Sequence, residues 1–281
     1  MNRGGSKGNN TIQKDYFLPS LNLKYNLNDK NSLRLGASKT YTLPQAKEIS
    51  PYRYVGVNFN SQGNPNLKPS DHYNLDLKWD FNPTPTELIS LTAFYKLIKN
   101  PISRIEVASA GGYLSYENIA DKATVAGVEV EIRKNLFVRP VSNAAHGMNK
   151  LSLGLNGSYI YTNAKMPLAT VTTGSQLEGA APWIVNFDLS HNFTKGERSF
   201  VNTLVLNYVS DKIYTIGTQG YQDIMEQGVL TLDFVSQAKL NKHLSFNLKA
   251  RNLLNSSYKL SRKANENGEK VILNDYKKGI N

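Results

Sequence analysis

The chain has 281 residues, enough for two ordinary domains or for one large all-β domain. Its net charge of +11 comes from 33 Lys and Arg against 22 Asp and Glu, and it contains no cysteine. Disulfides and thiolate metal sites are therefore excluded. Nucleic acid is not an expected partner, because no basic helix, aromatic RNA-binding motif or zinc-ligand spacing accompanies the charge.

Hydropathy gives little guidance about a membrane. No window of about 18 apolar residues predicts a membrane helix. The mean hydropathy of -0.42 is that of a soluble protein. Membrane β-strands alternate apolar with polar residues, so a mean hydropathy does not reveal them. Residues 1–16 contain no apolar segment typical of a signal peptide, so an exported protein of this sequence would be expected to lack its beginning.

Apolar and polar residues alternate in about ten segments. The clearest is residues 73–81, in which every odd position from Tyr73 to Phe81 is apolar and every even position is polar or charged. This period of two is typical of a strand with different surroundings on its two faces. The predicted strands are residues 16–27, 32–41, 73–81, 88–97, 125–134, 150–162, 183–193, 200–208, 230–238 and 244–251.

The connections alternate in length along the chain. Short turns such as "NDKN", "NPTPTE", "TKGER" and "LNKH" are separated by much longer segments, and only residues 135–149 fit neither class well. Outer-membrane barrels have short periplasmic turns and longer extracellular loops. Strands of about ten residues also suffice to cross the hydrocarbon layer. We therefore predict an all-β fold, an antiparallel transmembrane β-barrel segment, with a soluble sandwich as the alternative.

If the apolar face meets lipid, the opposite face lines a lumen. Its cations and anions nearly balance, which favours cross-strand ion pairs over a charge-selective pore. Lys39 is an exception on the apolar side, near a strand end where a lysine can reach lipid head groups. The predicted lumen-lining charges are Lys24, Arg34, Asp76, Lys78, Glu129, Glu131, Arg133, Asp188, Asp233, Lys249 and Arg251.

No catalytic constellation is evident, so neither an enzyme nor a cofactor is expected. Glu129 and Glu131 share a strand face as a glycosidase pair would, but the adjacent Arg133 favours a structural ion pair. No metal site is predicted, because each histidine lacks a histidine partner two or four residues away. The histidines are His72, His146, His191 and His243.

Ligand binding is expected in the long connections, where tyrosines gather. Aromatic side chains with a polar tip suit iron chelates or sugars when they lie on loops. The alternative is that they only pack the loops together. The candidate ligand-binding residues are Tyr52, Tyr54, Tyr113, Tyr116, Tyr214 and Tyr221.

Five segments together resemble a known family. They are "FLPSLNLKYNLNDKNSLRLGASKTYTLPQ", "GNPNLKPSDHYNLDLKWDF", "LISLTAFYKLIKNPI", "GVEVEIRKNL" and "NLLNSSY". In this order and spacing they resemble the C-terminal half of a TonB-dependent outer-membrane receptor, most closely the Bacteroidetes-type members. The resemblance covers essentially the whole chain.

The resemblance implies a 22-stranded barrel in the Gram-negative outer membrane that takes up a scarce nutrient such as an iron-siderophore complex. Residues 1–281 would supply about ten strands, with "DYKKGIN" at the start of an incomplete terminal strand. The plug domain and the N-terminal barrel half would be missing. Implied partners are outer-membrane lipid, the plug, the TonB complex through that plug, and a surface lipoprotein in some members.

Two other functions stay open at this point. One is a structural or non-functional truncated outer-membrane barrel protein without transport activity. The other is a soluble carbohydrate-binding sandwich or a β-hydrolase.

Overall fold

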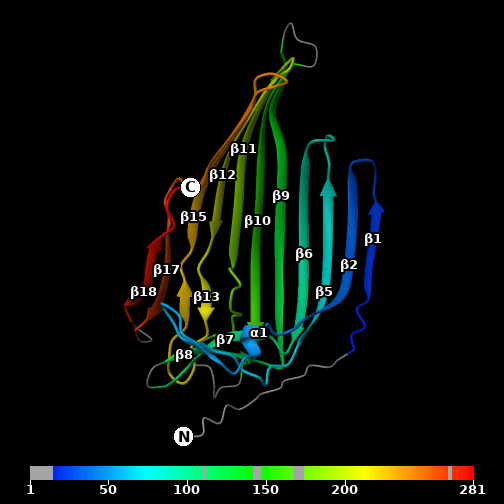
Figure 1. Cartoon of the computed structure of the whole chain (residues 1–281). Helices are drawn as coiled ribbons and strands as arrows, with labels where there is room; N and C mark the ends of the chain where they lie inside the picture. The colour runs from blue at the N-terminus through cyan, green and yellow to red at the C-terminus, as the bar shows by residue number, and fades with distance from the viewer. Residues whose placement is uncertain (1–14, 110–111, 142–146, 167–173, 265–267) are drawn as a thin grey trace.

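The computed structural model describes residues 15–109, 112–141, 147–166, 174–264 and 268–281, which are nearly all β-structure (Figure 1). Ten strands form one antiparallel sheet in the order β1-β2-β5-β6-β9-β10-β11-β12-β15-β16. Their bounds are β1 Ser20–Asn26, β2 Asn31–Thr42, β5 Ser70–Phe81, β6 Leu88–Lys99, β9 Lys122–Pro140, β10 Met148–Ala164, β11 Trp183–Lys195, β12 Arg198–Val209, β15 Val229–Lys239 and β16 Ser245–Ala250.

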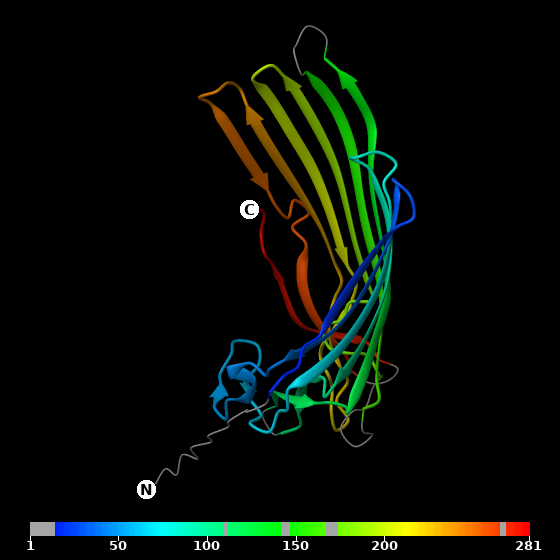
Figure 2. The ribbon, with the colours of Figure 1, turned by 90° about the vertical axis from the view of Figure 1, so that its right-hand side faces the viewer.

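The ten strands stand side by side as one tall, curved and twisted wall (Figures 1 and 2). Each strand pairs with the wall strand that precedes it along the chain, so the sheet is a simple up-and-down meander. This arrangement confirms the predicted all-β antiparallel architecture of ten strands. In the part of the chain that the structure describes, no helix is long and apolar enough to cross a membrane.

Short turns join the strands at one end of the wall, and local chemistry fixes their shape. After β1, the Asn28 carboxamide oxygen accepts hydrogen bonds from the backbone N–H groups of Lys30 and Asn31, at 3.0 and 2.9 Å. Between β11 and β12, Gly196 has a φ of +58° at the first position of a two-residue turn. Side chains that bond the backbone and a glycine with positive φ both specify tight hairpins.

The predicted long turn at residues 135–149 is wrong. Strands β9 and β10 run through most of this segment, and only residues 141–147 connect them. The register shifts near Leu151, which pairs with Phe137, while the next residue, Ser152, pairs with Asn135. Leu136 is thus an extra residue on β9. A β-bulge reverses the phase of the alternation, which is why the pattern seemed to end there.

The long connections at the other end contain short strands that were predicted as loops. They form two small sheets, in the orders β3-β4-β8-β7 and β13-β14-β17-β18, beside a one-turn helix. The bounds are β3 Arg53–Tyr54, β4 Ser61–Gln62, β7 Ile102–Val107, β8 Tyr113–Asn118, β13 Lys212–Thr215, β14 Ile224–Glu226, β17 Ser257–Lys263, β18 Lys270–Lys277 and α1 Ala46–Ile49.

The segment "DYKKGIN" differs from its predicted role as the start of a wall strand. Residues 275–277 belong to β18, which pairs with β17 in a small sheet. The end of the segment bonds the two residues that follow β16. The backbone N–H and C=O of Asn281 bond Arg251 at 3.2 and 2.7 Å, and the Gly279 carbonyl accepts a 2.8 Å hydrogen bond from the Asn252 side chain.

The apolar side chains of the wall are exposed, and the buried core lies elsewhere. Leu75 and Leu77 on β5 are 49% and 50% exposed, and Phe246 on β16 is 56% exposed. The cluster of buried apolar residues, which includes Ile105 and Ile216, lies under the long connections. A soluble sandwich would bury one face of its sheet. The exposed apolar face of this wall instead suits contact with hydrocarbon.

Close packing on the polar face predicts a steric test at Gly154. A Cβ atom there would overlap the Asp188 carboxylate on the neighbouring strand, whereas nothing lies within 4 Å of a Cβ at Gly157. We expect Gly154→Ala to lower the free energy of unfolding by about 1–3 kcal/mol. Adding Asp188→Ala should restore most of the loss. The protein is held in outer-membrane vesicles and unfolded with urea. The measurement is the urea concentration at which half of it no longer migrates as the folded band in electrophoresis.

Gly157→Ala, on the same strand but the opposite face, is the matched control and should leave the midpoint unchanged. Equal losses at Gly154 and Gly157 would show that the polar face is not closely packed at Asp188.

Candidate functional site

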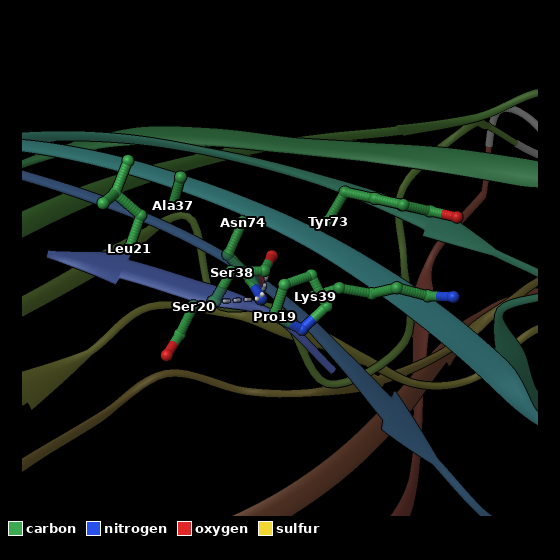
Figure 3. Close-up of a pocket in the computed structure, with 8 residues that line it drawn as sticks. All are labelled: Pro19, Ser20, Leu21, Ala37, Ser38, Lys39, Tyr73 and Asn74. Carbon is green, nitrogen blue, oxygen red and sulfur yellow. Dashed lines mark hydrogen bonds between the residues drawn. The ribbon is translucent and has the colours of Figure 1, made fainter. Parts of the chain in front are cut away.

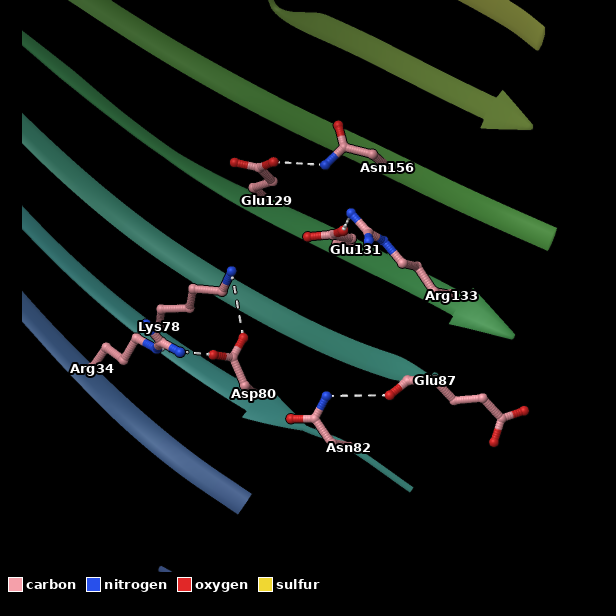
Figure 4. Close-up of polar contacts among 9 residues, drawn as sticks. All are labelled: Arg34, Lys78, Asp80, Asn82, Glu87, Glu129, Glu131, Arg133 and Asn156. Carbon is pink, nitrogen blue, oxygen red and sulfur yellow. Dashed lines mark hydrogen bonds and ion pairs between the residues drawn. The ribbon is translucent and has the colours of Figure 1, made fainter. Parts of the chain in front are cut away.

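The polar face of the wall carries a compact ion-pair group on β2 and β5. Arg34 and Lys78 are direct neighbours in the register. The Asp80 carboxylate lies 3.2 Å from Arg34 Nε and 3.4 Å from Lys78 Nζ, and its side chain is only 8% exposed (Figure 4). One nearly buried anion therefore bridges two adjacent cations, and its contact with Arg34 is a cross-strand ion pair of the predicted kind.

Glu129 and Glu131 do not form a carboxylate pair of the glycosidase kind. Glu131 Oε1 lies 2.7 Å from Arg133 Nη2, and the Asn156 side-chain amide donates a 2.6 Å hydrogen bond to Glu129 Oε1 (Figure 4). Each carboxylate is held by its own polar partner. The structural ion pair predicted for Arg133 is thus confirmed with Glu131.

The other predicted lumen-lining charges lie on strands of the same wall. Lys24 is opposite Arg34 in the register, and Asp233 accepts a 2.8 Å hydrogen bond from the backbone N–H of Asn252. That these side chains line a lumen stays a prediction. Their positions are Lys24 on β1, Asp76 on β5, Asp188 on β11, Asp233 on β15, Lys249 on β16 and Arg251 directly after β16.

A cavity of about 230 Å³ lies among the long connections and combines a cation with aromatic rings. The Arg104 guanidinium carbon on β7 is 4.5 Å from the ring centroid of Tyr214 on β13. The Phe59 ring centroid is 6.2 Å from that of Tyr214. The lining residues are Lys47, Asn58, Phe59, Ser61, Arg104, Leu114, Tyr116 and Tyr214.

Arg104 is fixed by a second long connection. Its Nη2 atom lies 3.6 Å from Glu178 Oε1, and its backbone N–H donates a 2.5 Å hydrogen bond to Glu178 Oε2. Burial raises the pKa of Glu178, and the contacts with Arg104 oppose that rise. This pair holds the guanidinium against the Tyr214 ring, where a cation–π contact is favourable.

Tyr116 supplies a neutral hydroxyl to the cavity. It is 9% exposed on β8, and burial raises the pKa of its phenol despite the opposing charge of Arg104. The phenol therefore keeps its proton at physiological pH and can donate a hydrogen bond. Cation, aromatic face and phenol together can bind an anionic ligand with flat rings.

Only two of the six predicted tyrosines, Tyr116 and Tyr214, share this cavity. Tyr113 lines an adjoining cavity of about 320 Å³, which shares Asn58, Phe59 and Leu114 with the first.

The other three tyrosines lie outside both cavities. The ring of Tyr54 is 5.3 Å from Lys47 Nζ, and the ring of Tyr221 is 5.4 Å from the Arg262 guanidinium carbon. Tyr52 is 74% exposed.

Sequence reasoning missed Lys47, Phe59, Arg104 and Glu178. A search for cations near loop aromatics would have found Lys47 and Arg104, since both lie within ten residues of a predicted tyrosine. In the described residues no group of three or more His, Cys, Asp and Glu could hold a metal ion, and His146 lies outside them.

Residues 2–253 match the family model of TonB dependent receptor-like, beta-barrel proteins. The chain belongs to this family. The ten-stranded sheet is thus part of a receptor barrel in the outer membrane, in a TonB-linked and non-enzymatic family. The soluble sandwich and the β-hydrolase are thereby excluded.

Several known proteins are similar to this chain at low sequence identity. An iron-regulated outer membrane virulence protein of Vibrio cholerae is 24% identical over 240 residues, 82% of this chain and 34% of that protein. The ferric yersiniabactin uptake receptor FyuA of Yersinia pestis has a TM-score of 0.56 at 16% identity, over 94% of this chain and 35% of that one.

A third similar protein is the siderophore receptor PirA of Acinetobacter baumannii. Its TM-score is 0.56 at 18% identity, over 85% of this chain and 37% of that one. The chain therefore spans about a third of the length of the relatives it matches.

The buried position of Asp80 predicts a loss of stability when its charge is removed. Asp80→Asn leaves Arg34 and Lys78 adjacent without their shared anion. We expect the free energy of unfolding to fall by about 1–3 kcal/mol, measured as a lower melting temperature of the folded band.

The matched control is Asp275→Asn on β18, because its ion pair with Lys259 is 43% and 38% exposed. That change should cost less than about 1 kcal/mol. A larger loss at Asp275 than at Asp80 would contradict a stabilising role for the polar-face group.

Proposed function

We propose that this chain forms the C-terminal part of the barrel of a TonB-dependent receptor that takes up a scarce nutrient such as an iron-siderophore complex. Residues 1–281 would act as one structural unit. The plug domain and the other strands of the barrel would lie outside this chain. Family membership supports the receptor part of the proposal, and relatives described as iron-regulated, ferric or siderophore receptors suggest the nutrient.

The observation that carries the proposal is the cavity around Arg104. It lies at the end of the wall where the long connections gather, which is the extracellular end in barrels of this kind. Ferric siderophores are commonly anionic and contain flat rings or conjugated groups. A guanidinium stacked on Tyr214 and the neutral phenol of Tyr116 offer complementary contacts.

The remaining predicted residues take secondary roles in this proposal. Tyr113 would extend the site into the adjoining cavity, whereas Tyr52, Tyr54 and Tyr221 would contact only a larger ligand or a surface lipoprotein. The polar face would contact the plug, through which the TonB complex acts.

Affiliation with the Bacteroidetes-type branch is a separate proposal that rests on sequence resemblance. The similar proteins named above come from Vibrio, Yersinia and Acinetobacter and give it no support.

Removal of the Arg104 charge should weaken ligand capture. We expect Arg104→Gln to raise the half-saturating concentration for uptake of a ⁵⁵Fe-labelled siderophore by about tenfold, because one cation–π contact and one charge-assisted bond are lost. Tyr214→Leu, which leaves the Arg104–Glu178 pair in place, should have a similar effect. The measurement is uptake by cells that carry the whole protein, with catecholate, hydroxamate and phenolate chelates compared.

Arg198→Gln, at the start of β12 at the opposite end of the wall, is the control and should leave uptake unchanged. The alternative of a structural or non-functional barrel protein gives a different result. It predicts a folded outer-membrane barrel that neither binds nor takes up any of the chelates, with or without Arg104.

A further inference from the structure

Three lysines interrupt the apolar face of the wall at one end of neighbouring strands. They are Lys39 on β2, Lys99 at the end of β6 and Lys122 at the start of β9. Lys39 is opposite Tyr73 in the register, and Lys99 is opposite Lys122. Alternation places all three on the face that carries the exposed leucines of β5. We call them the lysine cluster.

Two lysines of the cluster lie near one aromatic ring, and the cluster has excess positive charge. Lys39 Nζ and Lys99 Nζ lie 5.6 and 5.3 Å from the centroid of the Tyr73 ring. Asp71 Oδ1 lies 3.9 Å from Lys39 Nζ, so the Asp71 carboxylate partly neutralises the charge of Lys39. Lys99 and Lys122 are exposed. A fourth exposed lysine, Lys165, directly follows β10 at the same end of the wall.

The position of the lysine cluster on the wall indicates which part of the membrane it meets. It lies where the long connections begin, beyond the apolar part of β5 and beside an aromatic group in which Tyr16 stacks on Tyr41 at 3.8 Å. Tyrosines at the ends of barrel strands mark the level of the lipid head groups. A lysine at this depth extends its amine to the polar interface. At the extracellular end, that interface belongs to the outer leaflet.

A depression of about 390 Å³ lies next to the cluster and is lined chiefly by apolar atoms (Figure 3). Leu21 and Ala37 are apolar lining residues, and Lys39 and Tyr73 lie at one side with their side chains extended in the same direction. The other lining residues are Pro19, Ser20, Ser38 and Asn74. An apolar depression beside cations fits an acyl chain that is attached to a phosphorylated head group.

We propose that the lysine cluster binds the phosphate groups of an outer-leaflet lipid, with an acyl chain against Leu21 and Ala37. The site is on the outside of the barrel, away from the Arg104 cavity, and does not depend on which nutrient is taken up. Each lysine near a phosphate-bearing surface contributes a similar increment of affinity. Loss of all three should weaken binding by about a hundredfold, and loss of one by about fivefold.

The test compares a triple variant, Lys39→Gln/Lys99→Gln/Lys122→Gln, with the unchanged protein in uncharged detergent. The probe is fluorescent bis-phosphorylated lipid A, with its dephosphorylated form and inorganic phosphate as separate arms. We expect weaker binding of the phosphorylated lipid by the variant and little binding of the dephosphorylated lipid by either protein. Rising salt should weaken binding to the unchanged protein more than binding to the variant.

The matched control, Lys30→Gln/Lys195→Gln/Lys242→Gln, removes three exposed lysines at the short-turn end and should bind as the unchanged protein does. Equal losses in both triple variants, or no loss in the first, would overturn the proposal. Inorganic phosphate that binds as tightly as the lipid would overturn the lipid assignment. If the first triple variant does not fold, Lys122→Gln alone must still show the fivefold loss.

Discussion

Continuous backbone pairing between neighbouring strands is the constraint on which the rest of this structure depends. In hydrocarbon each unpaired N–H or C=O group costs several kcal/mol, so a spanning sheet cannot tolerate gaps. Strands β2 and β5 meet this condition with an unbroken register from Asn31↔Phe81 to Thr42↔Ser70. Because the register is unbroken, side chains on both strands alternate in phase. A slip of one residue would turn every lipid-facing leucine inward.

The two faces produced by this register are organised in different ways. The outer face needs no partners among its own side chains, because lipid surrounds each leucine. The polar face must satisfy its own charges, and it does so with short contacts such as Glu131–Arg133 and Asn156–Glu129. It also packs closely, since Gly154 leaves room for the Asp188 carboxylate. These contacts hold the polar side chains of the wall in fixed positions.

The strands of the wall could be predicted from the sequence because the two faces of the sheet have different surroundings. Apolar and polar residues therefore alternate strictly, as in residues 73–81 within β5. It failed where alternation changes phase or stops. The extra residue Leu136 hid the far ends of β9 and β10. The small sheets have strands too short for a periodic signal, and β4 meets β8 through the single pair Ser61↔Leu114. The cavity was hidden for another reason: the partners of Arg104 lie 74 and 110 residues away along the chain.

The end of the wall that carries the long connections is held together by contacts between separate connections. Ile105 forms a parallel bridge with Ile216, and the next residue, Glu106, pairs with Arg262. With the contacts of Glu178 included, three other connections hold the segment that carries Arg104. That segment leaves the wall at Lys99 and returns at Lys122, which face each other in the register. Lys99 and Lys122 of the lysine cluster therefore stand at the base of the connection that carries Arg104, so the proposed lipid contact and the cavity share this connection.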